Sequence, residues 1–164
     1  MKLALSPDWT EFLSALISHR VRFLLVGGHA VAAHGEPRLT EDLDVFVEAA
    51  EKNAGRLRKA LVEFGFGGVV PKAGDLAVPG KVWMLGRKPY RIDILTGISG
   101  VTFEEAWDSR VELEFVKKPL FVIGRAALVR NKVASGREKD LRDVAILAEA
   151  AAKPTRRRRT KRGS

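Results

Sequence analysis

The sequence predicts a mixed α/β domain in which helices cover one face of a mixed sheet. Short runs rich in strand-forming residues, over 23–26 and 42–47, alternate with longer stretches whose apolar residues recur at helical spacing. Gly27-Gly28 and Gly35 separate the first of these elements. We expect acidic side chains on the other face of the sheet, with two helices closing the fold at its C-terminal end.

The first helix is predicted to begin at Pro7 and to run to about Ser18. Ser6 is a favourable N-cap, proline is tolerated at the first helical position, and Asp8 suits the first turn. Its apolar residues recur at helical spacing and should form one buried face. The next elements are a strand over residues 23–26, a short helix over 29–34 and a strand over 42–47.

Further along the chain, the pattern predicts a helix over 48–64, a loop over 69–80 and a hairpin of strands over 81–85 and 90–95. A helical turn over 103–107 and strands over 111–116 and 120–123 follow. The closing helices are expected over 124–135 and 137–151. Their apolar residues predict inward-facing sets of Ala127, Leu128 and Val133 in the first helix, and Leu141, Val144, Ala145, Leu147 and Ala148 in the second.

Length and composition indicate one globular domain over residues 1–152. A chain of 164 residues with 46% hydrophobic and 30% charged residues can bury a proper core. We expect no membrane segment, because no apolar run approaches the roughly 20 residues that a spanning helix needs. The first residues do not resemble a signal peptide, and the absence of cysteine suits a reducing compartment, so we expect the cytoplasm.

The net charge of +9 comes mostly from the last twelve residues, 153–164. They hold seven Lys and Arg and no acid, which leaves 22 basic and 20 acidic residues in the rest of the chain. A self-repelling segment without apolar residues is expected to be disordered. It could attract RNA or DNA through sequence-independent phosphate contacts, or simply increase solubility.

The strongest indication of chemistry is the pair Asp42 and Asp44 beyond a Gly27-Gly28 turn. Alternation along a strand puts both carboxylates on one face, with Cβ atoms about 6–7 Å apart. Such a pair can converge on one or two Mg²⁺ ions, which bind carboxylate and phosphate oxygens. Glycine allows close approach to a phosphate, and N–H groups at a helix start favour an anion. A solvated edge with an ordinary turn remains the alternative.

The spacing of Val26-Gly27-Gly28 and Asp42-Leu43-Asp44-Val45 resembles the signature of the nucleotidyltransferase superfamily, which has the DNA polymerase β fold. The fuller run of residues 27–47 is similar to the branch that contains AbiEii-type toxins. The resemblance implies a third metal-binding carboxylate on a later strand, and Asp93 between Ile92 and Ile94 fits it. A salt bridge from Asp93 to Arg87 or Arg91 is the alternative. In the superfamily the position of Gly28 is often serine, so the phosphates here would depend more on Lys and Arg.

The remaining candidates are residues that could contact a nucleotide. Arg38 and Thr40 lie between the short helix and Asp42, and a guanidinium matches phosphate oxygens in bidentate fashion. The stretch 128–140 is similar to the closing motif of the same branch, which implies nucleotide contacts from Lys132, Arg137, Lys139 and Asp140. An ordinary ion-paired helix junction, Lys132 with Asp140 and Arg137 with Asp143, is the alternative.

Together these observations predict a Mg²⁺-dependent nucleotidyltransferase, with two ions expected and Mn²⁺ as a substitute. It would move an NMP from an NTP to an acceptor hydroxyl and release pyrophosphate, with Asp42, Asp44, Asp93 and Lys132 as catalytic residues. The resemblance favours an RNA end such as that of tRNA as acceptor, and a cognate toxin or antitoxin as partner. A catalytically silent protein of the same fold, acting as a binding or toxin–antitoxin partner, is the alternative.

Overall fold

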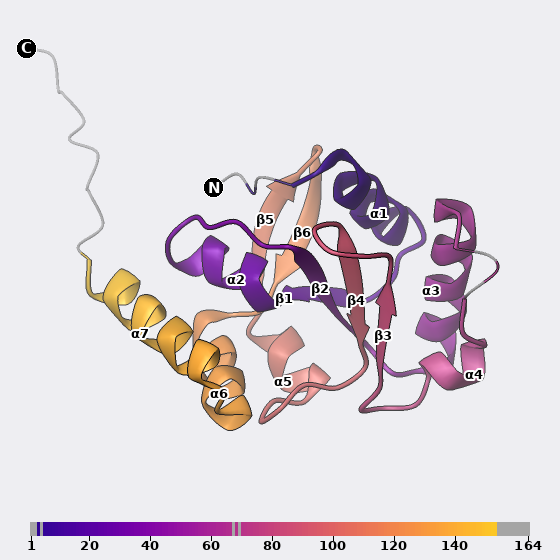
Figure 1. Ribbon diagram of the computed structural model, residues 1–164. Coiled ribbons are helices and arrows are strands. Elements are labelled where there is room, and N and C mark those ends of the chain that lie inside the picture. The colour runs from indigo at the N-terminus through magenta and orange to yellow at the C-terminus, as the bar shows by residue number, and fades with distance from the viewer. Residues whose placement is uncertain (1–2, 4, 67, 69, 154–164) are drawn as a thin grey trace, which may run out of the picture.

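The computed structural model describes residue 3, residues 5–66, residue 68 and residues 70–153. Seven helices and six strands form one mixed α/β fold within these residues (Figure 1). The helices are α1 (Pro7–Ser18), α2 (Gly27–His34), α3 (Glu51–Phe64), α4 (Ala73–Leu76), α5 (Phe103–Asp108), α6 (Arg125–Ser135) and α7 (Glu138–Ala152). The strands are β1 (Phe23–Val26), β2 (Asp42–Val47), β3 (Val82–Leu85), β4 (Arg91–Leu95), β5 (Val111–Phe115) and β6 (Lys118–Val122). The predicted disordered tail over 153–164 lies outside these residues except for Lys153.

The six strands form a single sheet in the order β3-β4-β2-β1-β6-β5. The pairs β1–β6 and β2–β4 are parallel, whereas β1–β2, β3–β4 and β5–β6 are antiparallel. The sheet is therefore mixed, as the sequence predicted. The parallel pair β2–β4 places Asp44 opposite Asp93 and Asp42 opposite Arg91, although about fifty residues separate the two strands in the sequence.

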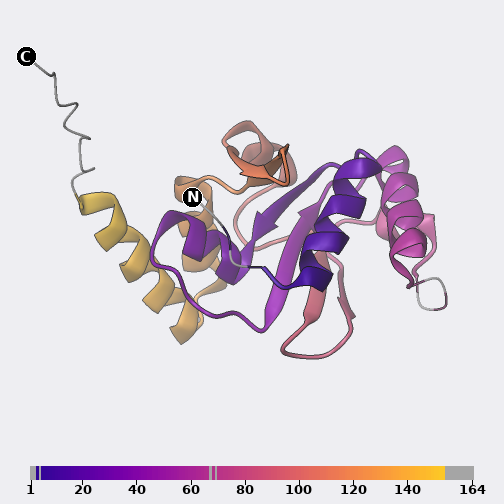
Figure 2. The same cartoon turned by 90° about the horizontal axis from the view of Figure 1, so that it is seen from above.

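Helices α1 and α3 pack side by side against one face of the sheet (Figures 1 and 2). Helix α1 starts as predicted, because the Ser6 hydroxyl accepts a hydrogen bond from the Trp9 N–H at 3.2 Å. Its buried face includes Phe12, which packs edge-to-face on Phe64 of α3. Strand alternation sends Leu43 and Val45 to this covered face and the two aspartates to the other. The apolar side chains of β2 therefore pack in the core on the covered face, while its aspartates lie on the opposite face.

Some predicted boundaries and faces were wrong. The helix predicted from residue 48 begins at Glu51, and the loop predicted over 69–80 contains the short helix α4. In the closing helices, Val133 is 55% exposed and Leu141 is 52% exposed, although both were expected to face inward. Val144 is only half-buried, and Ala145 and Ala148 are exposed. The buried side chains there are instead Lys132, Asp140 and Asp143, together with the predicted Ala127, Leu128 and Leu147.

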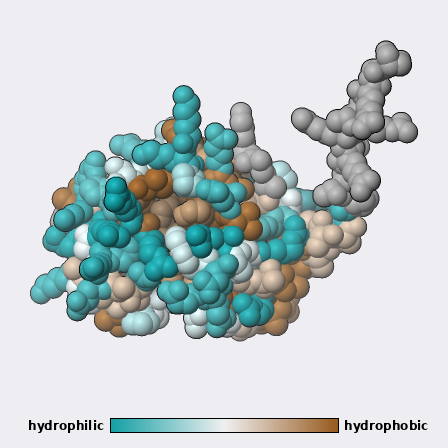
Figure 3. Space-filling view, turned by 180° about the vertical axis from the view of Figure 1, so that it is seen from behind, coloured by the Kyte–Doolittle hydropathy of each residue, from teal (hydrophilic) through white to brown (hydrophobic). Residues whose placement is uncertain are grey.

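One face of the molecule is mostly polar (Figure 3). Seen from behind, a smaller hydrophobic area is set among hydrophilic side chains (Figure 3). No helix in the described part of the chain combines the length and apolar character needed to cross a membrane.

Candidate active site

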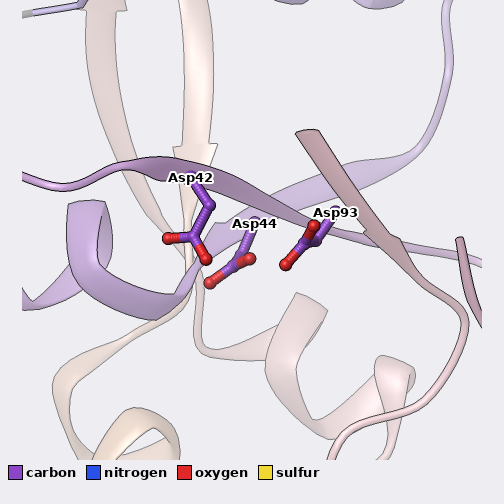
Figure 4. A group of neighbouring side chains, drawn as sticks. All are labelled: Asp42, Asp44 and Asp93. Atoms are coloured by element: carbon purple, nitrogen blue, oxygen red, sulfur yellow. The ribbon is translucent and has the colours of Figure 1, made fainter. Parts of the chain in front are cut away.

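Three aspartates converge on the face of the sheet that α1 and α3 leave uncovered. Asp42 and Asp44 of β2 and Asp93 of β4 point to the same side (Figure 4). One carboxylate oxygen from each residue lies within 4.8 Å of the others. An all-oxygen set of three carboxylates is the donor chemistry that hard divalent cations such as Mg²⁺ and Mn²⁺ prefer. These residues could therefore hold a metal ion.

The turn between β1 and α2 brings the helix N-terminus against the acidic cluster. Val26, the last residue of β1, pairs with Asp44 across the sheet, and α2 begins at the next residue. Gly27 has φ +67°, and a Cβ built there would lie 2.0 Å from Asp44 Oδ2. Only glycine fits, because a side chain would be both strained and in collision with the carboxylate. The N-cap Val26 gives no side-chain hydrogen bond, so the first N–H groups of α2 keep the capacity to bind an anion.

Gly28 lies beneath the segment that joins α2 to β2. A Cβ at this position would meet the Thr40 methyl at 2.6 Å and the Arg38 guanidinium at 3.4 Å. The methyl of Thr40 therefore fills the space that a serine side chain at position 28 would need. The contact gives a steric reason for glycine at this position, where the superfamily that the sequence resembles often has serine.

The segment before β2 is held by a buried histidine. The Thr40 hydroxyl and His29 Nε2 are 2.5 Å apart, and the His29 ring also forms a hydrogen bond with the backbone of Asp42. Burial lowers the pKa of His29 to about 4, against the raising effect of Asp42, so the ring is neutral at pH 7. His29 thus positions Thr40 and Asp42 and is not available as an exposed metal ligand.

The electrostatics of the cluster single out Asp44. Burial raises its pKa to about 7, the negative charges of Asp42 and Asp93 act in the same direction, and Lys132 opposes them. Asp42 and Asp93 share a different cation. Arg91 donates to Asp93 Oδ1 at 2.8 Å, to Asp93 Oδ2 at 3.0 Å and to Asp42 Oδ2 at 3.0 Å. Asp44 is therefore the carboxylate that takes up a proton near neutral pH.

A network of ion pairs around two buried acids joins α6, α7 and the segment before β2. Lys132 Nζ is 3.3 Å from Asp140 Oδ1 and 3.0 Å from Asp143 Oδ2. Arg38 binds Asp143, and Arg137 binds Asp140 at 2.8 Å. Although burial alone would raise it, the pKa of Asp140 falls to about 2, because Arg137, Ser135 and Lys132 donate hydrogen bonds to it. Both acids stay ionised, so they hold three cations in place.

The acidic cluster, the helix turn and all members of this network except Asp143 line one cavity of about 930 Å³. All predicted site residues border it: Gly27, Gly28, Arg38, Thr40, Asp42, Asp44, Asp93, Lys132, Arg137, Lys139 and Asp140. The predicted pairing of Lys132 with Asp140 is present, whereas Arg137 pairs with Asp140 and not with Asp143. Sequence reasoning gave no role to Asp143 as a holder of Arg38 and Lys132. Its spacing of three residues from Asp140 on one helical face was the available indication.

Comparisons with known proteins identify the fold. No family model matches the sequence, and no curated protein matches it. The antibiotic-resistance factor ANT(2'')-Ia, in a solution structure, is 13% identical with a TM-score of 0.57, covering 88% of this chain and 82% of that chain. The lincomycin-bound lincosamide antibiotic adenylyltransferase LnuA is 16% identical with a TM-score of 0.53, covering 91% and 99%. An antigenic nucleotidyltransferase-like protein from Paracoccidioides brasiliensis is 17% identical with a TM-score of 0.52, covering 89% and 77%. The chain therefore has the fold of nucleotidyltransferases.

Proposed function

We propose that this protein is a Mg²⁺-dependent nucleotidyltransferase that moves an NMP from an NTP to an acceptor hydroxyl. One observation carries the proposal: three carboxylates from the parallel strands β2 and β4 converge beside the start of α2 within a nucleotidyltransferase fold. Carboxylates alone would suit many metal sites. A helix N-terminus next to them adds a place for the phosphates.

Each part of the cavity then has a chemical task. The N–H groups that follow Gly27 and Gly28 bind the triphosphate, and Arg38 and Lys132 supply positive charge to it. Asp42, Asp44 and Asp93 would hold two Mg²⁺ ions, with Mn²⁺ as a substitute. When bound, these ions neutralise charge on the phosphates and align the attacking and leaving oxygens.

Asp93 stands on β4, one strand farther from α2 than the other two acids (Figure 4). This position suits a base on the acceptor side. The acceptor oxygen attacks the α-phosphorus, the bond from that phosphorus to the bridging oxygen of the β-phosphate breaks, and pyrophosphate leaves. Asp93 takes the proton of the acceptor hydroxyl, directly or through water. Arg38 and Lys132 would bind the leaving pyrophosphate, which carries the negative charge left by the broken bond.

Two classes of acceptor are proposed. The resemblance to AbiEii-type toxins favours an RNA end such as that of tRNA, and would make the chain one member of a toxin–antitoxin pair. The structural neighbours favour a hydroxyl of a small molecule, since LnuA is a lincosamide antibiotic adenylyltransferase and ANT(2'')-Ia has a crystal structure in complex with adenylyl-2''-tobramycin.

A silent protein of the same fold is the second candidate function. The three hydrogen bonds from Arg91 favour it, because a guanidinium can satisfy Asp42 and Asp93 without any metal. In that case the cavity would serve a binding partner and not a reaction.

The deciding experiment incubates the protein with each α-³²P-labelled NTP, Mg²⁺ and one acceptor pool at a time: total RNA, total protein, an aminoglycoside or a lincosamide. Transfer of label by the wild type, its loss in Asp44→Ala and its retention in Asp75→Ala would support the enzyme. Asp75 is a suitable control because it is an exposed acid on α4, outside the cavity. No transfer from any NTP to any pool, with tight binding of a protein partner, would favour the silent alternative.

A further inference from the structure

Arg91 is the cation that lies directly against the acidic cluster. It pairs with Asp42 across β2 and β4 and precedes Asp93 by two residues, so all three side chains share one face. Its guanidinium donates three hydrogen bonds, two to Asp93 and one to Asp42, at 2.8–3.0 Å. These bonds use carboxylate oxygens that a bridging metal ion would need.

We propose that Arg91 competes with the divalent cation for the carboxylates and thereby couples metal binding to nucleotide binding. This inference rests on the proposed function. A metal ion that binds both Asp42 and Asp93 competes with the guanidinium for carboxylate oxygens that already accept its charge-assisted hydrogen bonds. A metal ion alone provides no new hydrogen-bond acceptor for the displaced guanidinium. A metal–nucleotide complex brings phosphate oxygens, which a guanidinium binds in bidentate fashion.

The surroundings of Arg91 allow this exchange. Its side chain is 22% exposed and borders the cavity, so it can turn toward a triphosphate without opening the core. Lys132 contrasts with it, because that side chain is only 7% exposed and is held between two buried acids. Of these two cations beside the carboxylates, Arg91 is therefore the exchangeable one and Lys132 the fixed one.

Competition and coupling have separable consequences. Removing Arg91 should tighten the binding of metal alone, since the competitor is gone. It should also reduce the factor by which nucleotide tightens metal binding, and linkage requires the reciprocal effect of metal on nucleotide binding to fall equally. If only the loss of positive charge mattered, metal alone would bind more tightly but the coupling to nucleotide would not change. The same result would then follow from removing any other cation near the site.

The test measures Mn²⁺ dissociation constants by electron paramagnetic resonance, for Mn²⁺ alone and with each α,β-methylene NTP analogue. The variants are Arg91→Met and Arg91→Gln, the latter retaining a hydrogen-bond donor in case the former fails to fold. Lys88→Met is the matched control, because Lys88 lines the same cavity and forms no ion pair within the described residues. Circular dichroism of each metal-free variant checks that the fold is kept.

We expect at least a tenfold tighter Kd for Mn²⁺ alone in the Arg91 variants and less than a threefold change in Lys88→Met. The analogue should tighten Mn²⁺ binding at least tenfold more in the wild type than in the Arg91 variants. Equal Mn²⁺ affinities in the Arg91 and Lys88 variants would overturn the role of Arg91 and leave the proposed function intact. Tighter Mn²⁺ binding without any response to nucleotide in any variant would support the competition but overturn both the coupling and the proposed function.

Discussion

Replacing Asp44 by asparagine is expected to stabilise the metal-free protein above pH 7. Burial and two neighbouring carboxylates raise the pKa of Asp44 from 3.8 to about 7 in the folded protein. In the unfolded chain the carboxyl titrates near its ordinary value. Between about pH 4 and pH 7 the folded state therefore binds more protons than the unfolded state, and stability falls as the pH rises. Above pH 7 the full penalty of the buried negative charge remains.

The size of the effect follows from the difference between the two pKa values. Three pKa units correspond to roughly 4 kcal/mol, which is a ceiling because the folded protein can relax around the charge. The asparagine amide in the Asp44→Asn variant would stay neutral and can still donate to Asp93. We expect Asp44→Asn to raise the free energy of unfolding by about 2 kcal/mol at pH 8, or about 4–8 °C in Tm.

The assay is urea unfolding in EDTA at pH 5 and pH 8, with Asp75→Asn as the control on an exposed acid. The Asp44→Asn variant should exceed the wild type at pH 8 and by less than half as much at pH 5, because only the part of the loss that falls between about pH 4 and pH 5 has then occurred. The control should match the wild type at both values. An Asp44→Asn variant that is equally or less stable at pH 8 would refute this account of the acidic cluster.

Three further predictions concern the helix turn and the ion network. Gly27→Ala forces a left-handed conformation that costs about 1–2 kcal/mol and puts a methyl group 2.0 Å from Asp44 Oδ2, so Mn²⁺ binding measured by calorimetry should be lost. Gly28→Ala should destabilise the protein through contact with the Thr40 methyl, and adding Thr40→Ser should recover about 1 kcal/mol in a double-mutant cycle of urea unfolding. Lys132→Met leaves two buried carboxylates without their shared cation and should lower the free energy of unfolding by about 3–5 kcal/mol at pH 7, with less loss at pH 3.

Much of the first half of the fold could be predicted from local residue chemistry. Ser6 and Pro7 fixed the start of α1, and apolar runs gave β1 and β2 with the bounds that the structure has. These elements depend on neighbours within a few residues. The short helix α2 starts two residues earlier than predicted, because Gly27 itself enters the helix from a left-handed backbone conformation.

The pairing that assembles the acidic cluster could not be derived in this way. Asp93 meets Asp44 because β4 lies parallel to β2, and strand order is a property of the whole sheet. Alternation placed Asp93 on the face opposite Ile92 and Ile94, which is correct, but only the resemblance to a family joined it to the other two acids.

The closing helices show where hydrophobic periodicity misleads. The rule assumes that apolar residues face the core, yet α7 turns Asp140 and Asp143 inward and leaves Leu141 half-exposed. Paired charges can take buried positions when every carboxylate oxygen finds a donor. A reading that allowed for ion pairs at spacing three would have put these acids on the same face as Leu147.

The ion network around Asp140 and Asp143 is better explained by the placement of its cations than by a contribution to the stability of the fold. Burying ionised groups carries a desolvation penalty that their mutual attraction offsets only in part, so apolar residues would hold α6 and α7 together at least as well. The network instead fixes Arg38 from the segment before β2 and Lys132 from α6 beside the turn at Gly27. Three cations shared by two acids leave one net positive charge at the cavity wall, whereas the cluster of three acids is only partly balanced by Arg91 and stays negative. A cavity that keeps opposite charges apart in this way is suited to a ligand that carries both, such as a metal ion bound to a polyphosphate.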